Sequence, residues 1–131
     1  MAIALEFGWW VSDGFPAMAT CNRLSNDSDA VDVLSCILMD TGGLPLDFTL
    51  EWLSEGIALI DSVQRGSLAS AEWDREDFGA SISAKVTELS SLYVETYSET
   101  IDTNAFRRAI VAWREFISTD PSEHVVLRVN V

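Results

Sequence analysis

The segment TNAFRRAIVAWREFIS, residues 103–118, carries the most regular pattern in the chain and decides where the core is anchored. Its apolar residues recur at the spacing of one helical face: Phe106, Ala109, Ile110, Trp113 and Ile117. Asp102 or Thr103 stands at the start, where a side-chain oxygen can accept a hydrogen bond from a free backbone N–H. The segment therefore predicts an amphipathic helix with one buried face.

An acid-rich stretch precedes this helix. It begins with EWDRED, residues 72–77, and continues through an alternating segment to Asp102. A core anchored at 103–118 with carboxylates crowded before it is typical of a scaffold that presents negative charge.

The composition bounds the class of protein. With 131 residues the chain is expected to form one domain, 1–131, long enough to bury a core of its own. Its hydrophobic fraction of 48%, with five Trp and six Phe, argues against disorder.

The charge bounds the partners. The net charge of -13 repels nucleic acid and anionic membranes, so we expect neither as a partner, whereas a basic protein would be attracted. The ordinary alternative is that the acidity keeps a small protein soluble. The first residues lack the basic start of a signal peptide, no apolar run could span a bilayer, and Cys21 and Cys36 are too few for a disulfide framework. We therefore expect a cytoplasmic protein with reduced thiols.

The remaining periodicities predict the other elements. Strands are expected at 2–11, 15–21, 78–83, 86–94 and 125–131, and helices at 30–39 and 45–65. Residues 25–28 and Asp47 are candidate helix caps, Gly66 is expected to end the second helix, and Gly56 is expected to mark close packing. Residues 67–77 are expected to form a linker, and the strand at 86–94 could extend past Glu95. The pattern predicts an α+β fold, with an antiparallel sheet of about five strands and about three helices packed on one face.

No motif for catalysis is present in the sequence, so the chain is not expected to be an enzyme. The single histidine, His124, is expected at the surface, and no nucleophile elbow or phosphate-binding loop occurs. The acids at 74–77 do not match a calcium loop, so no metal and no cofactor is expected. Three arginines of the last helix are expected to pair with acids of the same chain: Arg107, Arg108 and Arg114.

An acidic surface that surrounds aromatic side chains is the best candidate site. The residues expected to bind a partner are Glu72, Trp73, Asp74, Glu76, Asp77, Glu95, Tyr97 and Glu99. The aromatic rings would serve as desolvated anchors, and the carboxylates would steer a basic partner. The alternative is that Trp73 belongs to the core while its neighbours are solvated.

These features together resemble a known class of proteins. The helix that ends at Gly66, the pair Glu72-Trp73, the strand FGASI at 78–82 and the helix FRRAIVAWREFI at 106–117 are similar to small acidic immunity proteins of bacterial polymorphic-toxin and contact-dependent growth inhibition systems. The resemblance covers roughly the C-terminal two-thirds of the chain, mostly at core positions. It implies an immunity protein that binds and neutralises a cognate bacterial toxin domain, often a nuclease, by occluding its basic active-site groove.

Two alternatives come from other classes. One is a phage-encoded acidic inhibitor, or nucleic-acid mimic, that acts on a DNA-binding protein. The other is a small ligand-binding or enzymatic α+β domain, which would require a deep pocket with convergent polar groups.

Overall fold

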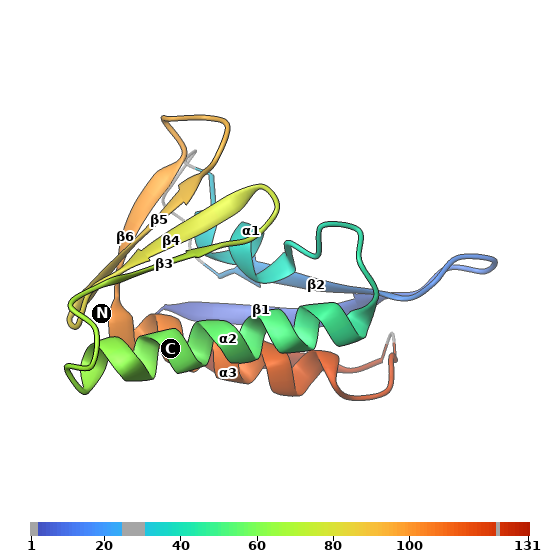
Figure 1. Cartoon of the computed structure of the whole chain (residues 1–131). Coiled ribbons are helices and arrows are strands. Elements are labelled where there is room, and N and C mark those ends of the chain that lie inside the picture. The colour runs from blue at the N-terminus through green and yellow to red at the C-terminus, as the bar shows by residue number, and fades with distance from the viewer. Residues whose placement is uncertain (1–2, 25–30, 123) are drawn as a thin grey trace.

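The computed structural model describes residues 3–24, 31–122 and 124–131, which form seven strands and three helices in two sheets (Figure 1). In chain order the elements are β1 (Ala4–Trp10), β2 (Met18–Arg23), α1 (Val33–Met39), α2 (Leu46–Gln64), β3 (Ala71–Asp74), β4 (Phe78–Ile82), β5 (Val86–Ser91), β6 (Ser98–Asp102), α3 (Thr103–Ile117) and β7 (Val126–Asn130). The predicted α+β class is confirmed. The prediction of one sheet of about five strands is wrong, because the strands divide into two antiparallel sheets.

The smaller sheet joins the two ends of the chain. Its strand order is β2-β1-β7, and Phe7 of β1 lies opposite Cys21 on one side and Leu127 on the other. Leu5 and Phe7 face inward and are fully buried, as the alternation along β1 predicts. The strands expected at 2–11, 15–21 and 125–131 are confirmed as β1, β2 and β7, although β2 begins at Met18 rather than at residue 15.

The larger sheet is a meander in the order β3-β4-β5-β6. Its first strand lies within residues 67–77, so the expected linker there is wrong: Ala71–Asp74 pairs with β4. The expected extension of β5 past Glu95 is also wrong, because a turn at 92–97 leads back into β6. A run of four residues with two acids is too short and too polar to stand out as a strand by its periodicity.

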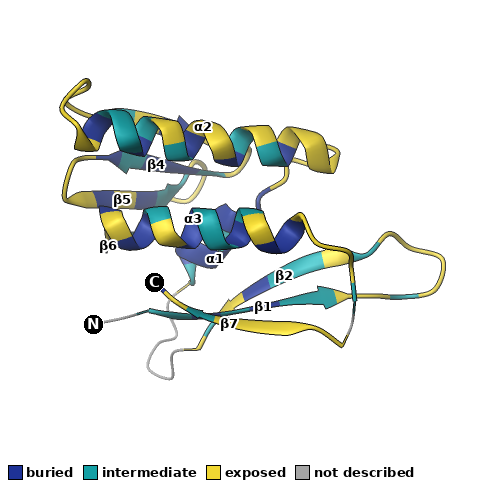
Figure 2. Ribbon diagram, turned by 90° about the horizontal axis from the view of Figure 1, so that it is seen from below, coloured by how far each residue is buried: buried dark blue, intermediate teal, exposed yellow. Residues whose placement is uncertain are grey.

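The helices fill the space between and beside the sheets. Helices α2 and α3 lie side by side, whereas α1 contacts β2 of one sheet and β4, β5 and β6 of the other (Figure 1). The turns of α2 and α3 alternate between buried and exposed bands (Figure 2). One buried cluster draws residues from both sheets and from all three helices. None of the described helices is long and apolar enough to cross a membrane.

The helix ends follow the sequence in part. Asp102 caps α3 by accepting a hydrogen bond from the backbone N–H of Ala105, as expected. Asp47 does not cap α2: Pro45 holds that position, and Asp47 lies in the first turn. Helix α1 is capped by Asp32, which accepts from Ser35 N–H; the candidate caps at 25–28 lie outside the described residues. Gly66, at φ 84°, ends α2 as expected.

Candidate functional site

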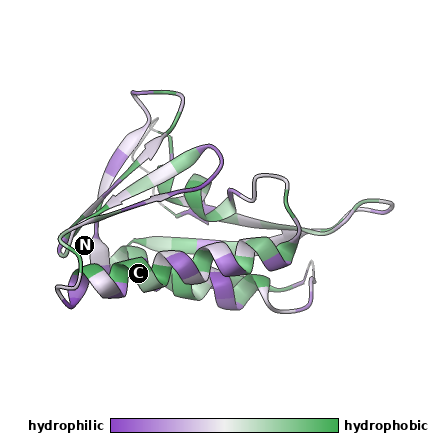
Figure 3. Ribbon diagram, in the orientation of Figure 1, coloured by the Kyte–Doolittle hydropathy of each residue, from purple (hydrophilic) through white to green (hydrophobic). Residues whose placement is uncertain are grey.

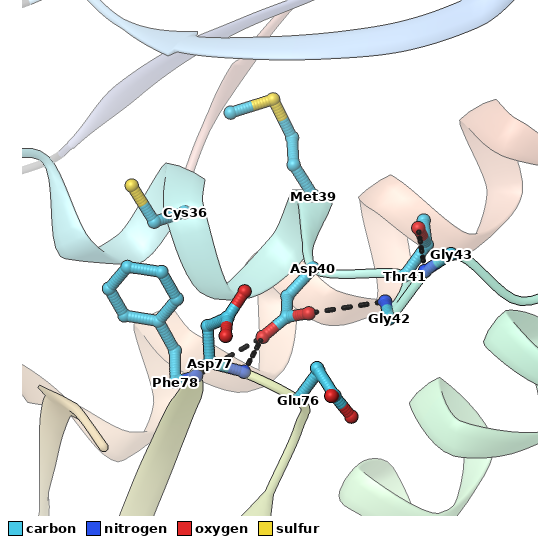
Figure 4. Close-up of a pocket in the computed structure, with 9 residues that line it drawn as sticks. All are labelled: Cys36, Met39, Asp40, Thr41, Gly42, Gly43, Glu76, Asp77 and Phe78. Atoms are coloured by element: carbon cyan, nitrogen blue, oxygen red, sulfur yellow. Dashed lines mark hydrogen bonds between the residues drawn. The ribbon is translucent and has the colours of Figure 1, made fainter. Parts of the chain in front are cut away.

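The turn between β3 and β4 is held against the end of α1 by Asp40. One carboxylate oxygen, Oδ2, accepts hydrogen bonds from the backbone N–H groups of Asp77 at 2.7 Å and Phe78 at 3.1 Å. The other oxygen, Oδ1, accepts from the N–H of Gly42 at 3.3 Å (Figure 4). A single carboxylate therefore fixes the turn and the loop after α1 relative to each other.

Arg75 completes this attachment from inside the protein. Its guanidinium is buried and donates to the backbone carbonyls of Ile37, at 2.9 Å, and of Asp40. These carbonyls belong to the end of α1, where the helix carries partial negative charge. The guanidinium also lies over the rings of Trp52, at 4.8 Å, and Trp73, at 5.3 Å. Burial lowers the pKa of Arg75 to about 10 while the nearby Asp40 raises it, so Arg75 remains charged at neutral pH.

Arg75 points inward, so the carboxylates next to it in sequence remain at the surface without it. Asp74, Glu76 and Asp77 of the turn are all exposed. Trp52 of α2 donates from its indole N–H to the Asp74 carbonyl at 3.1 Å, which joins the turn to the helix. The turn between β3 and β4 is strongly hydrophilic (Figure 3).

Helix α2 continues the negative surface. Its residues Asp47, Glu51 and Glu55 are spaced by four, so they lie on one face, and all are exposed. We call the combined surface the acidic end; it consists of Asp47, Glu51, Glu55, Asp74, Glu76 and Asp77.

Two open hollows lie in the acidic end. The larger, of about 580 Å³, runs between the loop after α1 and the turn, with Asp40, Glu76, Asp77 and Phe78 among its lining residues (Figure 4). The smaller, of about 220 Å³, is lined by Leu44, Phe48, Glu51, Trp52 and Glu55. None of the residues that line either hollow is basic, and Leu44 and Phe48 are 47% and 54% exposed. The surface thus combines carboxylates with exposed apolar side chains.

The structure places the predicted partner-binding residues in three different settings. Asp74, Glu76 and Asp77 belong to the acidic end. Glu95 and Tyr97 lie on the β5–β6 turn at the same end of the sheet, where Leu92 N–H donates to the Asp77 carbonyl at 2.9 Å. These five predicted residues are therefore gathered at one end of the larger sheet.

The other three predicted residues do not belong to that surface. Trp73 is 3% exposed, so the expectation that its ring meets a partner is wrong, and the alternative of a core residue is confirmed. Glu99 accepts from Leu34 N–H at 2.7 Å and pairs with Arg23 at 3.0 Å, so it holds β6, α1 and β2 together. Glu72 accepts from the Ser81 hydroxyl at 2.8 Å across the strand pair.

Sequence reasoning missed the contribution of α2. The candidate surface predicted from the sequence did not include Glu51 and Glu55, which lie about twenty residues before the turn at 74–77. The pattern that could have revealed this surface is the four-residue spacing of Asp47, Glu51 and Glu55. It places three acids on one face of a helix, beside Phe48, while the other face is apolar.

Positive charge gathers at the opposite end of α2. The side chain of Gln64 donates to the Ala84 carbonyl at 3.4 Å, and Thr103 N–H donates to the Lys85 carbonyl at 2.9 Å. These contacts bring together the end of α2, the β4–β5 turn and the start of α3. The basic residues of these segments are Arg65, Lys85, Arg107 and Arg108. The molecule therefore has an acidic end and a less acidic end.

The expected pairing of the α3 arginines is confirmed for one of them. Arg107 donates to the two carboxylate oxygens of Asp61 from Nε at 2.8 Å and from Nη2 at 3.2 Å, which lowers the pKa of Asp61 and raises that of Arg107. Arg114 donates instead to the Leu50 carbonyl and the Ser54 hydroxyl. Arg108 is exposed.

The side chains offer no metal centre within the described ranges, since no three His, Cys, Asp or Glu residues there are placed to hold an ion. Comparison with family models, with curated protein sequences and with solved structures found no match to this chain.

Proposed function

We propose that this chain is a non-enzymatic immunity protein that neutralises a basic toxin domain, such as a nuclease, by covering its active-site groove with the acidic end. The observation that carries the proposal is the composition of that surface: six exposed carboxylates beside exposed Leu44 and Phe48, with the arginine of the same turn buried. A groove that binds phosphates is lined by basic side chains, so it is complementary to such a surface in charge.

The two parts of the surface would act at different stages of binding. The carboxylates would accelerate encounter with a basic domain, because long-range attraction raises the association rate. Phe48 and Leu44 would slow dissociation by burying apolar area at the centre of the contact. Four of the eight basic residues lie at the other end of α2, whereas Arg114 lies beside Leu50 and Ser54, so the molecule would approach with its acidic end first.

The surface is fixed before binding. The Asp40 carboxylate accepts three hydrogen bonds, from the backbone N–H groups of Gly42, Asp77 and Phe78. The Arg75 guanidinium donates two more, to the backbone carbonyls of Ile37 and Asp40. A rigid turn loses little conformational freedom when a partner binds, which favours affinity.

The first experiment is co-expression of the full chain with the product of the gene immediately upstream, followed by co-purification at increasing salt. A stoichiometric complex with a basic domain that weakens as salt rises is the expected result. Recovery of a chromosomal DNA-binding protein instead would favour the phage-inhibitor alternative. A complex that is indifferent to salt would contradict a role for the acidic end.

Matched variants then locate the interface. The triple variant Glu51→Gln, Glu55→Gln and Glu76→Gln removes three charges from the acidic end. The control variant Asp13→Asn, Glu72→Gln and Glu88→Gln removes three exposed charges that lie outside the acidic end. We expect the first to lower the association rate by about tenfold at low salt and to flatten its salt dependence, and the control to retain most of both. Equal effects would show that only net charge matters and would remove the acidic end as the site.

A further inference from the structure

An apolar cavity adjoins the two hollows of the acidic end: Met39 and Thr41 also line the larger hollow, and Leu44 also lines the smaller one. It has a volume of about 430 Å³ and is bordered by the β1–β2 hairpin, the loop after α1, the start of α2 and the end of α3. Ten of its fourteen lining residues are apolar, four are threonines and none is charged. Its size falls within the roughly 300–1,000 Å³ typical of small-molecule sites.

Three buried polar atoms of its lining residues have no hydrogen-bond partner. They are the indole nitrogens of Trp9 and Trp113 and the hydroxyl of Thr49. Thr49 and Trp113 are 2% and 3% exposed. Buried polar groups in proteins are nearly always paired, so three unpaired groups around one cavity require an explanation.

The threonines of the cavity provide an internal comparison. Thr20 donates to the Gly8 carbonyl at 3.3 Å, Thr41 accepts from Gly43 N–H at 3.1 Å, and Thr119 donates to the Phe116 carbonyl at 2.6 Å. Only Thr49 among the four has a hydroxyl without a partner. Among the threonines that line the cavity, the unpaired hydroxyl is therefore the one on α2.

The chemistry of these groups defines what they can bind. An indole nitrogen can only donate a hydrogen bond, and a threonine hydroxyl can donate one as well. A ligand that pairs with all three groups must therefore offer a hydrogen-bond acceptor, such as an oxygen atom. A charged ligand would lose its hydration without gaining an opposite charge, since the lining contains none. The two indole rings offer aromatic surface for the rest of the ligand.

We propose that this cavity binds an uncharged, mainly apolar small molecule that carries a carbonyl oxygen, with Trp9, Trp113 and Thr49 as the donors. The three polar atoms have no exposed surface, so a ligand reaches them only when side chains of the cavity move. Met18 and Leu46, which are 58% and 50% exposed, are the flexible side chains placed to make it. The proposal does not depend on the proposed immunity function.

The test uses aryl ketones of three lengths and the alkylbenzenes that have a methylene in place of the carbonyl. Acetophenone, butyrophenone and hexanophenone are titrated into the full ¹⁵N-labelled chain, each beside ethylbenzene, butylbenzene or hexylbenzene. The indole N–H signals of the five tryptophans report which donor is engaged. We expect at least one ketone to bind about three- to tenfold more tightly than its alkylbenzene, as one net hydrogen bond allows, and to shift the Trp9 or Trp113 signal.

Conservative variants separate this role from a structural one. Thr49→Val removes a donor while keeping the shape, and Trp9→Phe removes the indole N–H together with part of the ring. In at least one of them we expect the ratio of ketone to alkylbenzene affinity to fall toward one. Thr20→Val is the control, because its hydroxyl is already committed to Gly8, and it should keep the preference. Because the Thr49 hydroxyl has no partner, Thr49→Val should fold with a melting temperature no lower than that of the parent.

Three results would overturn the proposal. The first is that no ketone binds, and the second is that each ketone binds no better than its alkylbenzene. The third is that the shifts are confined to Trp10, Trp52 and Trp73, which do not line the cavity.

Discussion

Replacement of Asp40 by alanine tests whether one carboxylate holds the acidic end in place. The variant would leave three backbone N–H groups, of Gly42, Asp77 and Phe78, without their acceptor. A lost hydrogen bond to a charged group costs about 1.5–3 kcal/mol when its partner stays buried, and water can reach these partly buried donors. We therefore expect a loss of about 2–4 kcal/mol in the free energy of unfolding.

The asparagine variant refines this expectation. Its amide oxygen can take the place of Oδ2 and keep the bonds from Asp77 and Phe78, whereas its NH₂ group cannot accept from Gly42. Asp40→Asn should lose about half as much stability as Asp40→Ala.

The assay is urea unfolding followed by tryptophan fluorescence, with hydrogen exchange of the Asp77 and Phe78 amides as the local measurement. Glu76→Ala is the control, because it removes a nearby exposed carboxylate that holds no backbone N–H, and it should stay within about 0.5 kcal/mol of the parent. If Asp40→Ala also stayed within that margin, or left the two amides protected, the carboxylate would not be what fixes the turn.

Three further predictions test the fold. A methyl group at Gly56 would lie 2.8 Å from two ring carbons of Trp73, so Gly56→Ala should be destabilised by about 1–2 kcal/mol in thermal melts despite its better helix propensity; a more stable variant would disprove the close packing. Asp102→Ala removes the α3 cap and should cost about 1 kcal/mol by urea titration, an effect that Asp102→Ser should largely restore. Burial raises the pKa of Cys21 from 9.0 to about 11, so between these pH values the thiol is protonated in the folded chain and ionised in the unfolded chain. The stability that the protonated thiol contributes is therefore complete below pH 9 and is lost as the pH rises toward 11. At pH 8 iodoacetamide should therefore label the half-buried Cys36 before Cys21, and mass spectrometry showing the reverse order would contradict the burial.

Most helices and the terminal strands could be predicted because each carries its own periodicity. Helix α3 shows this most clearly, since Phe106, Ala109, Ile110 and Trp113 are all buried as their spacing predicts. The division into two sheets could not be predicted, because alternation shows which residues share a face but not which strand lies beside them.

The candidate site was predictable only where its residues are consecutive. Asp74, Glu76 and Asp77 were found because they adjoin in sequence. Trp73 was misjudged because its charged neighbours hide an inward-pointing ring that packs on Gly56 and lies 6.0 Å from the ring of Phe106. The apolar cavity combines residues from β1, β2, α2 and α3, so no local pattern could reveal it.

The pairing of β1 with β7 has a consequence for the order of folding. Ala4 lies opposite Asn130, so the smaller sheet joins residues more than a hundred positions apart, whereas the larger sheet is built from neighbours in sequence. Contacts of such separation form slowly, because a long loop must close before they contribute. On the ribosome, β3 to β6 can assemble while β1 still lacks its second neighbour. The edge of β1 that pairs with β7 therefore stays open until residues 126–130 have been made, and an open strand edge can pair with another chain.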